Sequence, residues 1–140
     1  MSQYRVGYLI KLISNKLRAK ADANLRQHNL TLVQSGVLLY LGKHGGKAPQ
    51  KEIEEYLGVS HATVCGLISR MERNGHLRTF TDTKDRRIRI VSLTDQAKAI
   101  TAHLDSNIQQ NEKAMLNGLD ENQIQQLQEY LTIILNNIDP

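Results

Sequence analysis

Two short helical patterns separated by a two-residue turn, within residues 51–77, constrain the fold of this chain more than any other feature. Pro49 is expected at the first position of the first helix, and Gly58-Val59 makes the tight turn. Ser60 is the predicted N-cap of the second helix, which ends at Asn74-Gly75. Two helices at this spacing predict a helix-turn-helix.

The second of these helices has one apolar and one polar face. We expect the apolar face to pack on Ile53 and Leu57 of the first helix. The residues of the apolar face are Val64, Leu67, Ile68 and Met71. Small and hydrogen-bonding residues at the start of the polar face suit a DNA major groove, and arginines further along suit phosphates. The residues of this predicted reading face are His61, Ala62, Thr63, Gly66, Ser69, Arg70 and Arg73.

A β-hairpin is predicted directly after the two helices. Residues 77–81 and 88–93 are rich in β-branched or bulky side chains, and a polar, charged stretch separates them. The charged residues of this predicted tip are Lys84, Asp85, Arg86 and Arg87. We expect Asp85 to orient an arginine through a charge-assisted pair. A cationic hairpin tip beside a recognition helix forms a wing that reaches the minor groove or the DNA backbone.

Longer amphipathic helices are predicted on both sides of this unit. Apolar residues recur at helical spacing over residues 4–27, and a second helix starts at a Thr31/Gln34 capping box and stops at Gly45-Gly46. The residues that this second helix is expected to bury are Val33, Val37, Leu38 and Leu41. Two more amphipathic helices are predicted after the hairpin. Thr94 caps the first of them and Gly118 ends it, and the Asp120/Gln123 capping box starts the second.

The predicted fold is therefore mainly α with a small β-hairpin wing. We expect a single domain, residues 1–140, in which residues 31–93 form a winged helix-turn-helix DNA-binding lobe. Residues 1–30 and 95–140 form a helical dimerisation region, because the three long apolar stripes exceed what one small lobe can cover. The sequence thus predicts a homodimer.

The net charge of +4 is unevenly distributed along the chain. Residues 1–47 carry eight Lys/Arg against one acid, and residues 70–89 carry seven against three. Residues 90–140 reverse the balance, with two Lys/Arg against seven acids. The compact basic stretch at 70–89 predicts a polyanion partner, double-stranded DNA, and the basic and acidic ends can neutralise each other if they pack together.

The order of elements, with the run DTKDRRIRIVSLTDQAKA at residues 82–99, resembles the multiple antibiotic resistance regulator (MarR) family. The resemblance covers nearly the whole chain, and its most specific piece is the Asp-Arg-Arg wing followed by a strand and Leu93-Thr94. It implies that the first and last helices interlock into a dimer and that each wing inserts an arginine into the minor groove. It also implies a regulator, usually a repressor acting on a pseudopalindromic operator. Such a regulator releases DNA when a small lipophilic or phenolic effector, or an oxidant, acts.

By position, Arg87 resembles the wing-tip arginine of that family and Asp85 its supporting acid, while residues 60–63 match the start of the recognition helix. Gly66 stands where many members place an arginine that reads bases. Shape and wing contacts are therefore expected to carry more of the specificity. The complete set of residues predicted to bind DNA is Ser60, His61, Ala62, Thr63, Gly66, Arg70, Arg73, Lys84, Asp85, Arg86 and Arg87.

Cys65 is the only cysteine, so no intrachain disulfide can form and a cytoplasmic location is expected. We expect Cys65 to be a small packed side chain, because peroxide-sensing relatives carry their reactive cysteine in the first helix. No signal peptide or apolar run of about 18 residues is evident, which predicts no membrane association. Catalytic clusters and metal-ligand spacings are also lacking, so we predict no enzyme, no metal and no cofactor. Two alternatives stay open: a winged-helix protein-interaction module and a thiol-based redox-sensing regulator.

Overall fold

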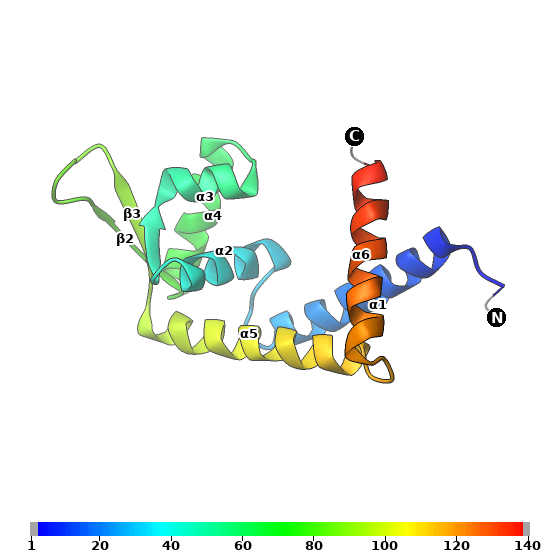
Figure 1. The fold of residues 1–140 in the computed structure, drawn as a ribbon. Coiled ribbons are helices and arrows are strands. Elements are labelled where there is room, and N and C mark those ends of the chain that lie inside the picture. Colours follow the sequence, from blue (N-terminus) through cyan, green and yellow to red (C-terminus); the bar gives the residue numbers. More distant parts are fainter. Residues whose placement is uncertain (1–2, 139–140) are drawn as a thin grey trace. The chain divides into compact units, whose positions relative to one another are not determined.

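The structure, a computed structural model, describes residues 3–138 of the chain. Residues 1–2 and 139–140, which close the two ends of the predicted dimerisation region, lie outside the described residues. Figure 1 shows the elements in chain order: α1 (Val6–Arg26), α2 (Leu32–Lys43), β1 (Lys47–Pro49), α3 (Gln50–Leu57), α4 (His61–Arg73), β2 (Leu77–Thr81), β3 (Arg89–Leu93), α5 (Asp95–Met115) and α6 (Glu121–Ile138).

The chain divides into two compact units, Met1–Leu104 and Asp105–Pro140. The first unit contains α1, the helix-turn-helix of α3 and α4, the sheet and the first half of α5. The second unit contains the rest of α5 and α6. Every predicted helix and the predicted hairpin occur, so a mainly α fold with a small β wing is confirmed.

The helices begin where the capping residues predict. Thr31 Oγ1 accepts a hydrogen bond from the Gln34 N–H at 3.2 Å, and the Thr31 N–H donates to Gln34 Oε1 at 3.0 Å. The same reciprocal pattern joins Asp120 and Gln123 ahead of α6, at 2.8 and 3.0 Å. These boxes satisfy N–H groups that a helix start leaves without an intrahelical partner.

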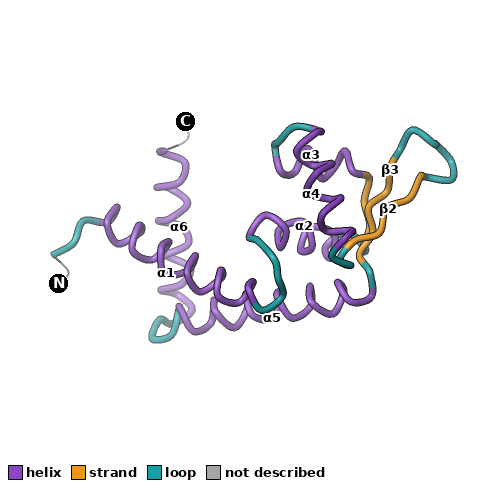
Figure 2. The backbone as a smooth tube through the Cα atoms, turned by 180° about the vertical axis from the view of Figure 1, so that it is seen from behind, coloured by secondary structure: helices purple, strands orange, loops and turns teal. Residues whose placement is uncertain are grey.

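The wing belongs to a three-stranded antiparallel sheet rather than to an isolated hairpin (Figure 2). Its strand order is β1-β3-β2, and the short strand β1 was not predicted. Pro49, expected at the first position of α3, is instead the last residue of β1 and the N-cap of α3, with an extended ψ of 142°. Proline is acceptable here because β1 is an edge strand, where a missing backbone N–H breaks no ladder.

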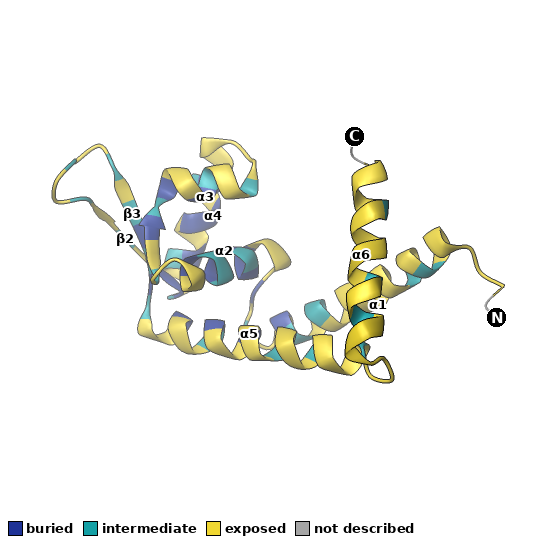
Figure 3. Ribbon diagram, viewed as in Figure 1, coloured by how far each residue is buried: buried dark blue, intermediate teal, exposed yellow. Residues whose placement is uncertain are grey.

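The core of the first unit ties α2, the helix-turn-helix and the sheet together (Figure 3). The predicted packing of the two short helices is confirmed, because Ile53, Val64 and Met71 are each 0% exposed. Val33 is a correction to the predicted interior of α2: it is 53% exposed, whereas Val37 is fully buried one turn later. The first turn of α2 buries Gln34 and Ser35 instead, so Val33 lies beside the buried face of the helix rather than on it.

Candidate nucleic-acid interface

The turn between α3 and α4 fixes the start of the proposed recognition helix. Gly58 ends α3 in the left-handed region at φ +67°, which favours glycine, and its N–H donates to the Glu54 carbonyl at 2.9 Å. Ser60 then caps α4, because its Oγ accepts a hydrogen bond from the Thr63 N–H at 3.2 Å. The two hydroxyl oxygens of Ser60 and Thr63 lie 2.9 Å apart. The Thr63 hydroxyl is thereby held at the N-terminus of α4.

Helix α4 buries one face and exposes the other, as predicted. Its buried residues are Val64, Leu67, Ile68 and Met71. The N-cap Ser60 is exposed, and so are all residues of the predicted reading face: His61, Ala62, Thr63, Gly66, Ser69, Arg70 and Arg73. Gly66 leaves space on this face, since an added Cβ would meet nothing closer than Arg70 Nη2 at 4.0 Å. The Arg70 guanidinium bends back to donate from Nε to the Gly66 carbonyl at 3.3 Å.

His61 is tied to α3 by a ring of hydrogen bonds. Its Nδ1 lies 2.7 Å from Glu54 Oε2, and its Nε2 lies 3.3 Å from Cys65 Sγ. Gln50 closes the ring, because its Nε2 donates to Cys65 Sγ at 3.1 Å and to Glu54 Oε2 at 3.3 Å. A base contact through either ring nitrogen of His61 therefore requires one of these pairs to open. Cys65 is half-buried and belongs to this polar ring, which the expectation of a simple packed side chain did not include.

The tip of the wing presents an oriented arginine. Arg87 donates from Nε to Asp85 Oδ1 and from Nη2 to Asp85 Oδ2, both at 3.1 Å, and its backbone N–H donates to Oδ1 at 3.0 Å. These hydrogen bonds lower the pKa of Asp85 and raise the pKa of Arg87, because they stabilise both charged forms. The Arg87 side chain is still 90% exposed. The predicted pairing of Asp85 with an arginine is confirmed, and Lys84 and Arg86 are exposed at the same tip.

A polar link between α4 and the wing was not predicted. Glu72 Oε2 accepts two hydrogen bonds from Thr79 of β2, from the N–H at 2.9 Å and from Oγ1 at 2.8 Å. Arg89 of β3 donates from Nη2 to Thr79 Oγ1 at 2.9 Å. The side-chain hydrogen bond from Thr79 is the main reason why the pKa of Glu72 is lowered.

A pocket of about 760 Å³ lies between the helix-turn-helix and the wing. Its lining includes the polar ring of α3 and α4 together with two wing cations, namely Gln50, Glu54, His61, Cys65, Arg87 and Arg89. The start of the proposed recognition helix and the wing arginines thus border the same hollow. Of the predicted DNA-binding residues, His61 of α4 and Arg87 of the wing therefore line one pocket within the first unit.

Side chains outside this surface offer little further chemistry. His76, at the start of the wing, is 3% exposed, and its Nδ1 has no hydrogen-bond partner among the described residues. Burial, and to a smaller extent the charge of His28, lowers the pKa of His76. Within residues 3–138, no three His, Cys, Asp or Glu side chains are arranged to hold a metal ion. No helix of this described part has the length and apolar character needed to cross a membrane.

Comparison with known proteins agrees with this geometry. A sequence model of the MarR family matches residues 28–88. The HTH-type transcriptional regulator YwaE of Bacillus subtilis is 29% identical over 126 residues, which are 89% of this chain and 71% of YwaE. The transcriptional activatory protein BadR of Rhodopseudomonas palustris is 41% identical over 49 residues, or 35% of this chain, and these span only 28% of BadR.

Solved structures extend the likeness to nearly the whole chain. MepR, a transcription regulator of the Staphylococcus aureus multidrug efflux pump MepA, has a TM-score of 0.80 at 26% identity, covering 97% of this chain and 100% of MepR. The same protein in complex with DNA has a TM-score of 0.78 at 26% identity, covering 98% of this chain and 100% of MepR. In its helix-turn-helix, its Asp-Arg wing and its flanking helices, this chain is similar to the MarR family of winged helix-turn-helix transcription regulators.

Proposed function

We propose that this regulator binds double-stranded DNA sequence-specifically as a homodimer and represses transcription from a pseudopalindromic operator. A small lipophilic or phenolic effector releases it from the DNA. We place it in the cytoplasm and assign it neither an enzymatic activity nor a cofactor. One observation carries the proposal: His61, at the exposed start of α4, and the oriented Arg87 border the same pocket.

The roles of the proposed DNA-binding residues follow from their positions. Thr63 stands in the first turn of α4, where a recognition helix meets base edges in the major groove. Arg70 and Arg73, in the last turn, suit phosphate contacts. Arg87 suits the minor groove, where narrow A·T-rich segments concentrate negative potential. The likeness to MepR in its complex with DNA supports these assignments.

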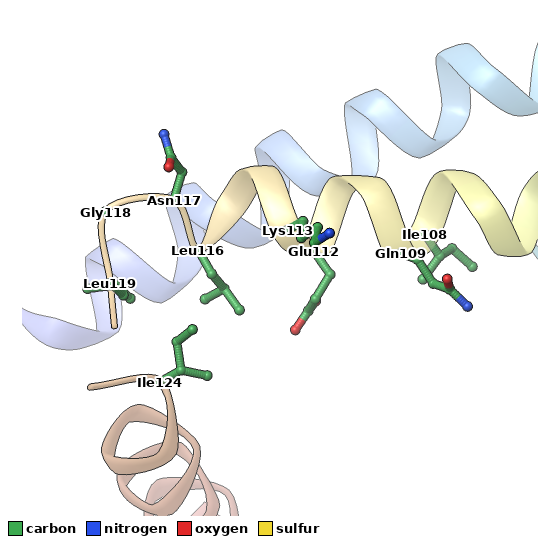
Figure 4. Close-up of a pocket in the computed structure, with 9 residues that line it drawn as sticks. All are labelled: Ile108, Gln109, Glu112, Lys113, Leu116, Asn117, Gly118, Leu119 and Ile124. Carbon is green, nitrogen blue, oxygen red and sulfur yellow. The ribbon is translucent and has the colours of Figure 1, made fainter. Parts of the chain in front are cut away.

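The proposed dimer rests on apolar faces that one chain leaves in water (Figure 3). Helix α6 has no buried residue, and its exposed large apolar side chains are Tyr130, Leu131, Ile133, Leu135 and Ile138. In α1 only Leu25 is buried, while Ile13 and Leu17 are 51% and 41% exposed. Within the second unit, Leu116 and Ile124 face each other beside a pocket of about 540 Å³ (Figure 4). A second copy supplies the cover that such helices need.

The proposed control by effector is geometric. Two recognition helices must lie about 34 Å apart to enter successive major grooves on one side of the duplex. In a dimer, the terminal helices set this separation. A ligand that binds between this scaffold and the DNA-binding lobe, with a preference of a few kcal/mol for another separation, releases the DNA.

The decisive experiment compares the wing with the recognition helix. Operator fragments are first selected from random DNA, and binding of the parent, Arg87→Ala and Thr63→Ala is then measured on operator and scrambled duplexes across a salt series. Arg87→Ala should weaken binding to both duplexes and reduce the salt slope by about one ion. Thr63→Ala should lose about 1–3 kcal/mol on the operator only and relax the preference at one or two base pairs.

Arg18→Ala, which removes an exposed arginine of α1, is the matched control and should leave the operator affinity nearly unchanged. Full affinity of Arg87→Ala at every salt concentration would show that the wing is not a DNA element. If the parent binds no duplex at low salt, the protein-interaction module becomes the better assignment, because a basic wing that contacts phosphates must respond to salt.

A further inference from the structure

Glu72 is an unexpected residue on a helix that faces DNA. A carboxylate near a duplex is repelled by the phosphates, so an acid in the last turn of α4, beside Arg73, should weaken binding if it faced the DNA. Instead, both hydrogen bonds that Glu72 Oε2 accepts come from Thr79 of the wing. The carboxylate is therefore directed at the base of the wing.

Thr79 is the centre of this link. A hydroxyl has one proton and two lone pairs, so Thr79 Oγ1 can donate to Glu72 and still accept from Arg89 Nη2. Thr79 also lies on β2, the edge strand next to β3, where an outward backbone N–H has no further strand to pair with. Glu72 satisfies that N–H. The three residues thus join α4, β2 and β3 in one chain of hydrogen bonds.

We infer that Glu72, Thr79 and Arg89 form a positioning clamp that fixes the wing relative to the recognition helix. The inference rests on the proposed DNA-binding function. Residues 74–76 connect α4 to β2 in a hydrogen-bonded turn, in which the N–H groups of Gly75 and His76 donate to the carbonyls of Glu72 and Met71. The clamp adds a side-chain link further along the wing. A wing tip must meet the minor groove while α4 occupies the adjacent major groove, and a fixed angle between them removes the entropy cost of that alignment.

Glu72→Ala removes the acceptor oxygens as well as the charge, and it tests the clamp because the loss of charge and the loss of these hydrogen bonds change the affinity in opposite directions. Removing a negative charge near a polyanion by itself strengthens binding. Loss of the clamp weakens it, and we expect operator affinity to fall about tenfold, the size of one lost hydrogen bond to a charged acceptor. Glu55→Gln, which removes an exposed charge from α3, is the control and should bind the operator at least as tightly as the parent.

A double-mutant cycle separates positioning from simple stability. Arg87→Ala is measured in the parent and in Thr79→Val, which deletes the hydroxyl, with Thr79→Ser as the conservative variant that restores parental affinity. If the clamp positions the wing, the loss caused by Arg87→Ala should be several-fold smaller in Thr79→Val than in the parent. Should Thr79→Val fail to fold, Glu72→Ala takes its place in the cycle.

The outcomes of this cycle distinguish the inference from the function beneath it. An Arg87→Ala variant that binds like the parent overturns the proposed wing contact itself. An equal loss from Arg87→Ala in both backgrounds, or tighter operator binding by Glu72→Ala, overturns the clamp and leaves DNA binding by the wing intact.

Discussion

The apolar stripe of α6 offers the sharpest test of the proposed dimer. Ile124, Leu127, Leu131, Ile134 and Ile138 recur at helical spacing on this stripe, and within one chain Leu131 is 44% and Ile138 75% exposed. Replacing these two by glutamate places a charge at both positions. If a second copy covers them, the substitutions remove the apolar burial and bury charges without partners.

The size of the effect follows from the exposed fractions. Full burial of a leucine or isoleucine side chain contributes about 1.5–3 kcal/mol, so covering 44% of one and 75% of the other contributes about 2–4 kcal/mol in each copy. Both copies of a symmetric dimer carry the substitutions, which gives about 4–7 kcal/mol in total. At about 1.4 kcal/mol for each factor of ten, the dissociation constant of the dimer should rise at least a hundredfold.

Sedimentation equilibrium over a range of protein concentrations measures this constant, and thermal unfolding by circular dichroism shows whether the monomer stays folded. Asn136→Glu is the matched control, because it adds one charge to the same helix away from the stripe and should leave the dimer intact. Deleting residues 120–140 is the coarser form of the test and should yield monomers or aggregates with poor DNA binding. A folded Leu131→Glu, Ile138→Glu protein with the parental dissociation constant would refute the reasoning.

Two further predictions concern buried or half-buried titratable side chains. Cys65→Ser places a hydroxyl where the thiol contacts Gln50 and His61, so operator affinity and effector response should be nearly unchanged. If peroxide treatment abolished DNA binding by the parent but not by the variant, the redox-sensing alternative would be favoured. Burial lowers the pKa of His76 in the folded chain, so as the pH falls protons bind the unfolded chain first. Stability should be full above pH about 6.5 and fall as the pH drops towards the lowered pKa of His76. His76→Gln should flatten this dependence in thermal melts; a parent whose melting temperature does not fall between about pH 7 and 5 contradicts it.

The parts of the fold that local signals specify could be predicted from the sequence. Thr31, Ser60 and Asp120 each carry an oxygen that satisfies helix-start N–H groups, and each caps the helix expected from its position. The apolar spacing of α3 and α4 also allows few arrangements other than packing of one on the other. The wing could also be predicted from a local signal, because two strand-like runs flank a charged stretch that is too polar to be buried.

The remaining features depend on neighbours that are distant in sequence. Strand β1 is only Lys47–Pro49, and it is a strand because β3 pairs with it, with Ala48 opposite Val91. The exposure of Val33 depends on which face of α2 the other elements cover, and in the first turn they cover Gln34 and Ser35. Likewise, Glu72 and Thr79 meet only once the hairpin folds back along α4, so neither residue carried a signal of its own.

The proposed interface leaves few side chains to read bases. Sequence specificity should therefore depend more on the shape of the DNA and on the spacing of helix and wing. Gly66 has no side chain, Arg70 is bent onto the Gly66 carbonyl, and both ring nitrogens of His61 face partners within the protein. Thr63 is then the main remaining donor and acceptor in the first turn of α4. When base contacts are few, discrimination depends on sequence-dependent groove width and on how accurately helix and wing are spaced. Binding should therefore be unusually sensitive to the spacing of operator half-sites: inserting one base pair between them should weaken binding more than any single base change within a half-site. Electrophoretic shifts on a series of such duplexes measure both, and equal or smaller losses from the insertion would contradict this account of specificity.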